Sequence, residues 1–292
     1  MRPRFNWKLR TRSLALGVRT LVVGIVNVTP DSFSDGGQFR SHQQAVDHAL
    51  GLLDEGADIL DIGGESTRPG KKQPVIARAE LERIVPVITG VLRARPEAVL
   101  SVDTYKAEVA RGAIASGAEI VNDVSGGHWD PQMLATIGHL HCGCVLMHTR
   151  GRPEEWHKLP PLQRYAVLDY VANGLRDICH AGLAAGIRRE HIVLDPGFGF
   201  GKSFDENYPL LARFEQLHKI GLPLLSGPSR KSFIGRTLEK NGADAPPNKR
   251  LNGTIAAVVA SVMKGAHIVR VHDVAPVVEA LKVADAVLAA EQ

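Results

Sequence analysis

The sequence predicts a (β/α)₈ barrel, in which eight parallel strands form a closed ring and a helix follows each strand. Eight short apolar runs, rich in β-branched residues and with little polar alternation, are typical of parallel strands covered on both faces. Each run is followed by a polar loop and then by a helical pattern. Eight such units in 292 residues favour a closed barrel over an open sheet. The runs are residues 20–28, 58–64, 99–104, 119–124, 143–148, 191–197, 222–227 and 266–273.

The stretches between the runs are amphipathic, most clearly over residues 41–57, 76–94 and 168–186. Residues 1–18 precede the first run and are predicted to be an N-terminal extension, while residues 19–292 form the barrel. Neither a Pro/Gly/Ser-rich linker nor a low-complexity tract divides the chain, so we expect a single domain. The segment "EKNGADAPPNK", residues 239–249, is predicted to be an exposed insert before the seventh helix of the barrel.

Composition and charge disfavour several classes of protein. The chain is 44% hydrophobic and 23% charged, as in ordinary globular proteins, and its net charge of +4 is compatible with an anionic substrate. The basic residues are scattered and few aromatics lie among them, so we expect no nucleic-acid binding. We also expect no membrane span and no signal peptide, because the apolar runs are too short.

Three cysteines, Cys142, Cys144 and Cys179, form no disulfide framework and favour a reducing cytoplasm. Two of them lie in "GHLHCGCVLMH", residues 138–148, which also contains three histidines. This segment could be interpreted as a metal site, but its spacing is not that of a usual zinc site. Buried free cysteines are the ordinary interpretation.

Polar residues gather at the carboxyl ends of the apolar runs. In a barrel these ends converge on one mouth, where the fold places its active site. There, Asp103, Asn122 and Asp195 could bind a metal, act as acid and base, or grip a heterocycle. They suit the amino-oxo-pyrimidine edge of a pterin or a guanine, because carboxylates accept paired hydrogen bonds and Asn both donates and accepts. Alternatively, each could cap the helix that follows it.

Several of these loops carry groups suited to anions. Lys231 and Ser232 lie in "GPSRKSF", and Lys231 can donate to a heterocycle carbonyl or to an anion. Arg68, in "GESTRPG", suits bidentate contact with phosphate or carboxylate. Arg270 and His272 end the last run, and loops after the seventh and eighth strands usually bind phosphate in such barrels. A solvated basic turn is the alternative for the Lys231 loop.

The long polar loop "NVTPDSFSDGG" follows the first run. Asn27 can supply an oxygen to Mg²⁺, which prefers few protein oxygens together with phosphate oxygens. Phe33 is an aromatic residue in a polar loop and suggests a ligand contact, and Asp35 is one of the acids of the loop. The Gly36–Gly37 pair permits motion, so we interpret the loop as a lid.

The segment "DPGFGFGK", residues 195–202, combines an acid with glycines and phenylalanines. Gly197 and Gly199 would let the backbone turn tightly beneath a flat ligand, and Phe200 would supply an apolar wall. A simple glycine-rich turn between a strand and a helix is the alternative. It explains the glycines but not the acid, Asp195, that precedes them.

Taken in order, the loops resemble the characteristic segments of the dihydropteroate synthase family, from about Leu21 to the C-terminus. These are "NVTPDSFSDGG", "DIGGESTRPG", "SVDTYK", "NDVSGG", "DPGFGFGK", "SRKSFIG" and "RVHDV". The resemblance implies a (β/α)₈ barrel that joins (7,8-dihydropterin-6-yl)methyl diphosphate to 4-aminobenzoate, giving 7,8-dihydropteroate and diphosphate in tetrahydrofolate synthesis. It also implies Mg²⁺ as cofactor, a homodimer and inhibition by sulfonamides.

The resemblance also implies roles for individual residues. It implies that the pterin is held by Asp103, Asn122, Asp195 and Lys231, lined by Met147 and Phe200, and packed against Arg270. It implies that Asn27 helps to bind Mg²⁺, and that the diphosphate is contacted by Arg68, His272 and Arg270, with Thr67 nearby. The 4-aminobenzoate would be framed by Phe33, Pro69, Lys231 and Ser232. The residues expected to act in catalysis are Lys231, Arg68, Asp35 and His272.

The departures from the family pattern are small. Thr149 and Arg150 stand where the family often has Met-Gln, and Pro228 precedes the Ser of "SRK". We expect these differences to change the shape of the loops more than the activity. Two alternatives remain, a pterin-dependent methyltransferase of the same barrel family and an inactive pterin-binding protein. Neither would need the segments "STRPG", "SRK" and "RVH" together, and the pterin carboxylates and basic residues are intact.

Overall fold

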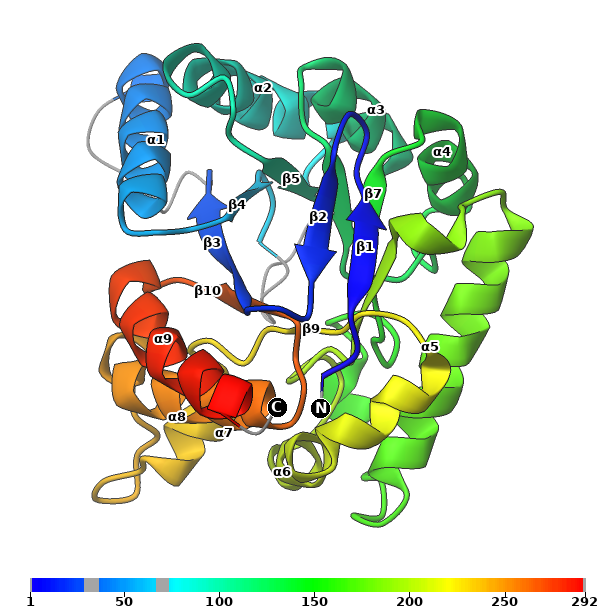
Figure 1. Ribbon diagram of the computed structural model, residues 1–292, viewed down its shortest axis with the longest axis vertical. Helices are drawn as coiled ribbons and strands as arrows, with labels where there is room; N and C mark the ends of the chain where they lie inside the picture. The colour runs from blue at the N-terminus through cyan, green and yellow to red at the C-terminus, as the bar shows by residue number, and fades with distance from the viewer. Residues whose placement is uncertain (1, 29–36, 67–73, 291–292) are drawn as a thin grey trace.

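The computed structural model describes residues 2–28, 37–66 and 74–290, and within them it confirms the predicted barrel (Figure 1). Eight parallel strands lie in the order β8-β7-β6-β5-β4-β3-β10-β9. A parallel bridge between Leu194 and Leu224 joins the two ends of this sheet and closes the ring. The strands are β3 (Leu21–Asn27), β4 (Ile59–Gly63), β5 (Leu100–Asp103), β6 (Ile120–Asp123), β7 (Gly143–Met147), β8 (Ile192–Asp195), β9 (Leu225–Ser226) and β10 (Ile268–Val271).

Helices surround the strands, and Figure 1 shows them as an outer layer around the ring. The three predicted amphipathic stretches are confirmed as α1 (Gly37–Asp54), α2 (Ala77–Ala94) and α5 (Val167–Ala184). One short helix, α7 (Ser232–Thr237), is additional and lies between β9 and the seventh barrel helix. The remaining helices are α3 (Ala107–Ala115), α4 (Met133–Leu140), α6 (Phe204–Ala212), α8 (Leu251–Met263) and α9 (Val274–Ala290).

Two apolar clusters explain why the strands are nearly all apolar. Outward-facing side chains such as Leu60, Ile62 and Val102 pack against the helices in the larger cluster. Inward-facing side chains such as Val23 and Ile59 fill the barrel in the smaller one. Because both faces of each strand are buried, polar residues are confined mainly to the strand ends.

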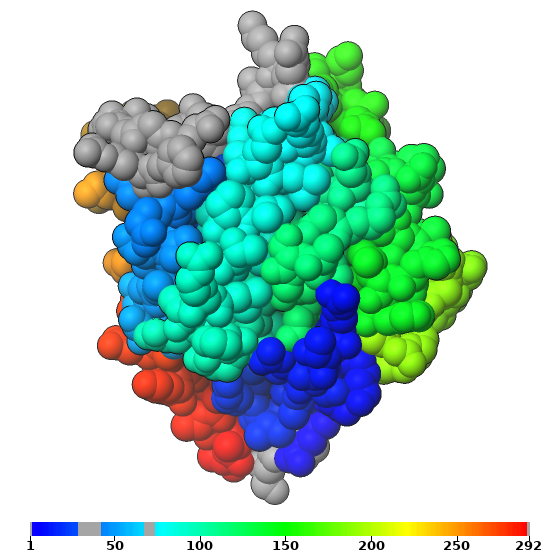
Figure 2. All heavy atoms as spheres, turned by 90° about the horizontal axis from the view of Figure 1, so that it is seen from above, coloured from blue at the N-terminus to red at the C-terminus, as the bar shows by residue number. Residues whose placement is uncertain are grey.

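A β-hairpin, β1 (Phe5–Lys8) and β2 (Ser13–Leu16), covers the N-terminal end of the barrel. Trp7 is buried within the inner cluster, and its indole nitrogen donates to the carbonyl of His191 at 2.8 Å. Figure 2 shows the hairpin in dark blue, between the green and the red parts of the chain. The hairpin therefore closes the end of the barrel opposite the mouth. The division of the chain at residue 18 stays a prediction.

Other predicted features can be located in the described residues. The insert at 239–249 is almost wholly exposed, as predicted, and lies between α7 and α8. The three cysteines are buried and free, and burial raises the pKa of Cys142 to about 12. Within the described residues, no helix has the length and apolar character needed to cross a membrane.

We predict that His267 makes the protein less stable in mild acid. Burial lowers the pKa of His267 to about 4, whereas an unperturbed histidine has a pKa of about 6.5. The unfolded chain therefore takes up a proton first, so the stabilisation is complete above about pH 6.5 and is lost as the pH falls toward 4. Urea titration should show that the titration of His267 lowers the free energy of unfolding by roughly 3 kcal/mol as the pH falls from about 6.5 to about 4.

A His267→Gln variant isolates this contribution. The imidazole Nδ1 lies 3.1 Å from the Leu224 amide nitrogen and Nε2 lies 2.9 Å from the Pro3 carbonyl, so a Gln amide can serve the same partners without titrating. The pH slope of this variant should be shallower than that of the wild type. His157→Gln, at an exposed position, should retain the wild-type slope. Equal slopes for the wild type and His267→Gln would contradict the assignment.

Candidate active site

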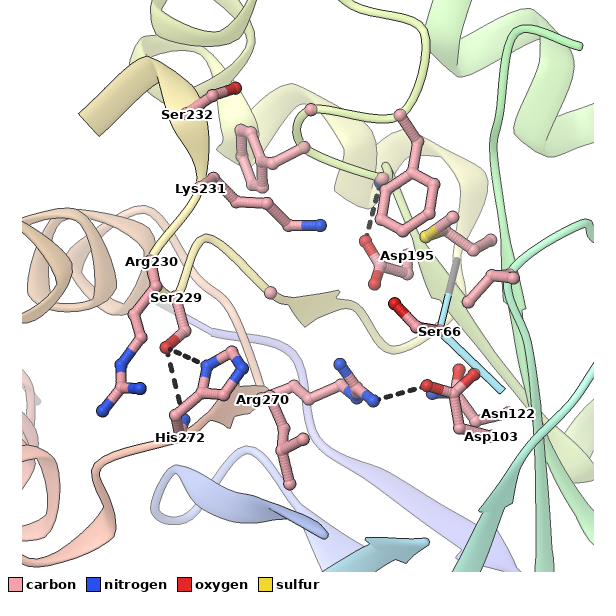
Figure 3. Close-up of a pocket in the computed structure, with 18 of the residues that line it drawn as sticks. Ser66, Asp103, Asn122, Asp195, Ser229, Arg230, Lys231, Ser232, Arg270 and His272 are labelled. Atoms are coloured by element: carbon pink, nitrogen blue, oxygen red, sulfur yellow. Dashed lines mark hydrogen bonds and ion pairs between the residues drawn. The ribbon is translucent and has the colours of Figure 1, made fainter. Parts of the chain in front are cut away.

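A cavity of about 340 Å³ opens at the carboxyl ends of the strands. Figure 3 shows Lys231 and Arg270 reaching into it from one side, with Asp103, Asn122 and Asp195 on the other. The structure thus brings together predicted residues from six strands and from the segments that follow β8, β9 and β10. Those that line the cavity are Asn27, Asp103, Asn122, Met147, Asp195, Phe200, Lys231, Ser232, Arg270 and His272. Phe33, Asp35, Thr67, Arg68 and Pro69 lie outside the described residues.

Strand register places the three polar groups of the predicted heterocycle site at a similar height in the barrel. Asp103 is paired with Asn122 across β5 and β6, and Met147 is paired with Asp195 across β7 and β8. Asp103 and Asp195 are each the last residue of a strand. The two carboxylates and the carboxamide therefore stand around the floor of one cavity. The side-chain hydrogen bonds of the turns after β5 and β6 are made by neighbouring residues and not by Asp103 and Asn122 themselves. Thr104 makes this bond next to Asp103, and Asp123 makes it next to Asn122.

A hydrogen-bonded ionic network lies beneath this floor. Arg270 donates from Nε to Asp61 Oδ2 and from Nη2 to Asp103 Oδ2, both at 2.6 Å. Asn122 donates from Nδ2 to the same Asp61 oxygen at 2.8 Å. One guanidinium therefore pairs with two carboxylates, and one carboxylate oxygen orients two cavity residues.

Sequence reasoning missed Asp61, although the sequence carries a signal for it. The residue stands in the middle of an apolar run, between Leu60 and Ile62, and is only 1% exposed. An acid inside a strand that is buried on both faces needs a charged partner, because an unpaired buried charge is costly. Attention to strand ends alone could not reveal such a residue.

Burial shifts the ionisation of the cavity carboxylates. It raises the pKa of Asp103 to about 7, against the opposing effect of the Arg270 charge. Burial also raises the pKa of Asp195, although the Gly197 amide and the Lys231 charge favour its ionised form. A ligand that donated hydrogen bonds to these carboxylates would further favour the charged state.

The loop after β8 adopts a tight turn that depends on glycine. Gly197 has φ +67°, and a Cβ at this position would lie 2.1 Å from the carbonyl oxygen of His148. The Gly197 amide donates to Asp195 Oδ1 at 2.7 Å, which fixes the carboxylate. Lys202 is buried and donates to the Gly197 carbonyl at 2.8 Å, so its ammonium stabilises the turn from within. Burial lowers the pKa of Lys202 to about 7.

The two basic side chains of the loop after β9, Arg230 and Lys231, have different partners. Arg230 has φ +56° and pairs with Asp273 through two hydrogen bonds. Lys231 instead places its ammonium 3.9 Å from the centre of the Phe200 ring, although both residues line the cavity. His272 donates from its backbone amide to Ser229 Oγ at 3.2 Å, and the same hydroxyl lies 3.0 Å from its Nδ1. Ser229 thus orients the imidazole.

The wall near Asn27 contains a second group that sequence reasoning missed. Glu65 lines the cavity and forms an ion pair with Lys106, which also pairs with the buried Glu80. Glu65 Oε1 also accepts from the amide of Val75 at 3.2 Å. Because Lys106 pairs with this carboxylate, Glu65 is held in place as part of the cavity wall and is not an isolated negative charge.

Arg150, one of the departures from the family pattern, connects the loops after β7 and β8. It is 7% exposed and donates to the carbonyl oxygens of Gly201 at 3.1 Å and Pro160 at 2.8 Å. It also forms an ion pair with the buried Glu206 at 3.5 Å. Since Gly201 follows Phe200 directly, Arg150 supports the aromatic wall of the cavity from behind.

Comparisons with known proteins agree on one family. A family model described as "Pterin binding enzyme" matches residues 23–272. The dihydropteroate synthase of Synechocystis sp. is 43% identical over 276 residues, which are 92% of this chain and 91% of that protein. The structure of Xanthomonas albilineans dihydropteroate synthase with 4-aminobenzoic acid has a TM-score of 0.87 and 42% identity, covering 99% of each chain. Yersinia pestis dihydropteroate synthase in a sulfonamide drug complex has a TM-score of 0.87 and 40% identity, covering 98% of this chain and 100% of the other.

We predict that Arg150→Met destabilises the protein by about 3 kcal/mol, because it leaves the buried Glu206 carboxylate without its cationic partner. Chemical denaturation would measure this loss. Arg152→Met is the matched control at an exposed position of the same loop, and it should cost no more than about 1 kcal/mol. Adding Glu206→Gln to Arg150→Met should recover part of the loss. A double variant less stable than Arg150→Met alone would show that the ion pair is not the cause.

Proposed function

The chain belongs to the dihydropteroate synthases, and we propose that the residues of its barrel mouth carry out the reaction of that family. The reaction condenses (7,8-dihydropterin-6-yl)methyl diphosphate with 4-aminobenzoate, giving 7,8-dihydropteroate and diphosphate in tetrahydrofolate synthesis. The observation that carries the assignment of roles is the placement of Asp103, Asn122 and Asp195 around one cavity, opposite Lys231 and Arg270.

The pterin binds on the cavity floor in this proposal. Its amino-pyrimidine edge donates to Asp195 and Asp103, while Asn122 offers both a donor and an acceptor. Lys231 donates to the ring carbonyl. Met147 and Phe200 provide apolar contact with the flat ring, and both line the cavity. The side chain of Arg270 would pack against the ring, with its guanidinium held by Asp61 and Asp103.

The diphosphate binds toward the loops after β9 and β10, which are the seventh and eighth strands of the barrel. His272 lines the cavity there, and Ser229 holds its ring. This location is the usual phosphate site of the fold. Arg68 and Thr67, outside the described residues, complete the site in the proposal, and Asp35 belongs to the same catalytic set.

The position of Asn27 fits Mg²⁺. Asn27 ends β3 and presents an amide group at the cavity. The described residues contain no cluster of three or more His, Cys, Asp or Glu side chains that could hold a metal alone. A hard cation that takes most of its ligands from diphosphate and water needs few protein oxygens. When bound, Mg²⁺ would neutralise negative charge on the diphosphate.

The side chains favour a dissociative reaction. Loss of diphosphate leaves positive charge on the pterin methylene, which the conjugated ring delocalises. The carboxylates of Asp103 and Asp195 would stabilise this cation, and His272 and Arg68 would stabilise the leaving anion. The arylamine needs only to be positioned, with Ser232, Phe33 and Pro69 around it. No side chain is assigned as nucleophile or strong general base.

Inhibitor binding, cellular location and oligomeric state rest on different observations. The sulfonamide complex of the Yersinia pestis relative supports binding of these inhibitors at the 4-aminobenzoate position. A cytoplasmic location is supported by the three free, buried cysteines. The homodimer rests on the family resemblance. Methyl transfer and inactive pterin binding are disfavoured, because neither explains Lys231 and His272 at one cavity with the pterin residues.

We predict turnover of the pterin diphosphate with 4-aminobenzoate, detected as formation of dihydropteroate, and its loss when a chelator removes Mg²⁺. Lys231→Ala should lower kcat strongly without unfolding the protein, because Lys231 is half-buried at the cavity and its contact with the Phe200 ring contributes little to stability. Lys240→Ala, in the exposed insert, is the matched control and should keep wild-type turnover. A folded wild type that forms no dihydropteroate in the presence of Mg²⁺ would refute the proposed function.

We predict that Asp195→Asn weakens the binding of a pterin analogue by about 1–3 kcal/mol, because an amide cannot accept both hydrogen bonds of the pyrimidine edge. Isothermal calorimetry would measure the affinity. Asp205→Asn, at an exposed position in the first turn of α6, is the control and should bind as the wild type does. Unchanged affinity in Asp195→Asn would remove this residue from the pterin site.

A further inference from the structure

Asp61 lies below the cavity rather than in it. The mouth cavity is lined by Asn122 and Arg270, whereas Asp61 is absent from its described lining. A second, smaller cavity of about 10 Å³ lies deeper in the barrel and is lined by Asp61, Asn122, Arg270 and Trp7, among others. Asn122 and Arg270 therefore border both cavities, and Asp61 contacts them only from beneath.

We propose that Asp61 is a positioning residue that sets the orientation of Asn122 and Arg270 for pterin binding. The inference rests on the proposed function, because it concerns how that site is held. Asp61 is buried between the hairpin and the floor of the mouth cavity and has no contact with the cavity itself. Its effect on a ligand must therefore pass through the two residues that it binds.

The chemistry of the carboxylate fixes the amide of Asn122. An ionised carboxylate only accepts hydrogen bonds, so the amide must turn its Nδ2 toward Asp61 Oδ2, at 2.8 Å. A flipped amide would place its oxygen against the carboxylate and be repelled. Asp61 thus keeps Oδ1 of Asn122 available to a donor of the ligand.

The same oxygen fixes the guanidinium of Arg270. Asp61 accepts from Nε and Asp103 accepts from Nη2, so the two carboxylates hold two different nitrogens of the planar group. With Asp103 alone, the guanidinium would be free to pivot about a single hydrogen bond. Asp61 also supplies part of the negative charge that balances Arg270 in a buried place.

Asp61→Asn tests the proposal with little change of shape. The Asp61 Oδ1 atom has no hydrogen-bond partner among the described residues, so an amide nitrogen can take its place beside the deeper cavity. The variant keeps an acceptor oxygen but loses the charge that holds Arg270. We expect at least a tenfold loss of affinity for a pterin analogue, measured by calorimetry. The KM for 4-aminobenzoate at saturating pterin diphosphate should change less than twofold.

Asp58→Asn is the matched control. Asp58 directly precedes the amino end of β4, the strand that contains Asp61. It also pairs with an arginine, Arg19, and accepts a hydrogen bond from the Val22 amide. This change also removes an ionic interaction from the barrel, but far from the mouth. Its affinity for the pterin analogue should equal that of the wild type. A tenfold loss in Asp58→Asn would show that a general loosening of the barrel explains the effect.

A double-mutant cycle separates positioning from general stability. In a background of Asn122→Ala and Arg270→Lys, Asp61→Asn should weaken pterin binding less than twofold, because the residues through which it acts are altered. The same tenfold loss in both backgrounds would overturn the proposal. If Asp61→Asn does not fold, Asp61→Ser replaces it in the same cycle, since a hydroxyl still accepts a hydrogen bond. A wild type that does not bind the pterin analogue would instead contradict the proposed function itself.

Discussion

The ionic interaction of Arg270 with Asp61 and Asp103 is the constraint on which the rest of the mouth depends. Three charged groups lie at the centre of a barrel whose strands are mostly apolar, and each is tolerable only because the others are present. The network joins β4, β5 and β10, and through Asn122 it reaches β6. Asp103 and Asn122 on the floor of the cavity therefore belong to one hydrogen-bonded unit with Asp61 and Arg270, and are not independent side chains.

The fold supplies the conditions for this network. The hairpin covers the N-terminal end of the barrel with Trp7, Leu9 and Leu16, so apolar side chains close the end opposite the mouth. Tight turns after the strands, such as the one built on Gly197 and Lys202, then aim side chains inward. The proposed reaction requires mainly this rigid, charged cavity floor, together with cationic groups that stabilise the leaving diphosphate.

The barrel could be predicted from the sequence because burial on both faces makes each strand an apolar run, and Asp103, Asn122 and Asp195 were identifiable because they lie near the carboxyl ends of such runs. Asp61 could not be found in this way, since it lies within a run and its partner, Arg270, is distant in sequence. The different orientations of Arg230 and Lys231 depend on a backbone turn with positive φ, which residue types alone do not reveal. The predicted roles of Phe33, Asp35, Thr67, Arg68 and Pro69 lie outside the described residues and stay predictions.

A crystal structure with a bound pterin analogue would show directly which atoms of the cavity meet the ligand. We expect the pyrimidine edge to lie within hydrogen-bond distance of Asp103, Asn122 and Asp195, with Arg270 against the ring. We also expect Arg270 to keep both of its hydrogen bonds to Asp61 and Asp103. A pterin bound elsewhere, or one that reached the floor only after Arg270 had left Asp61, would contradict the role proposed for this ionic network.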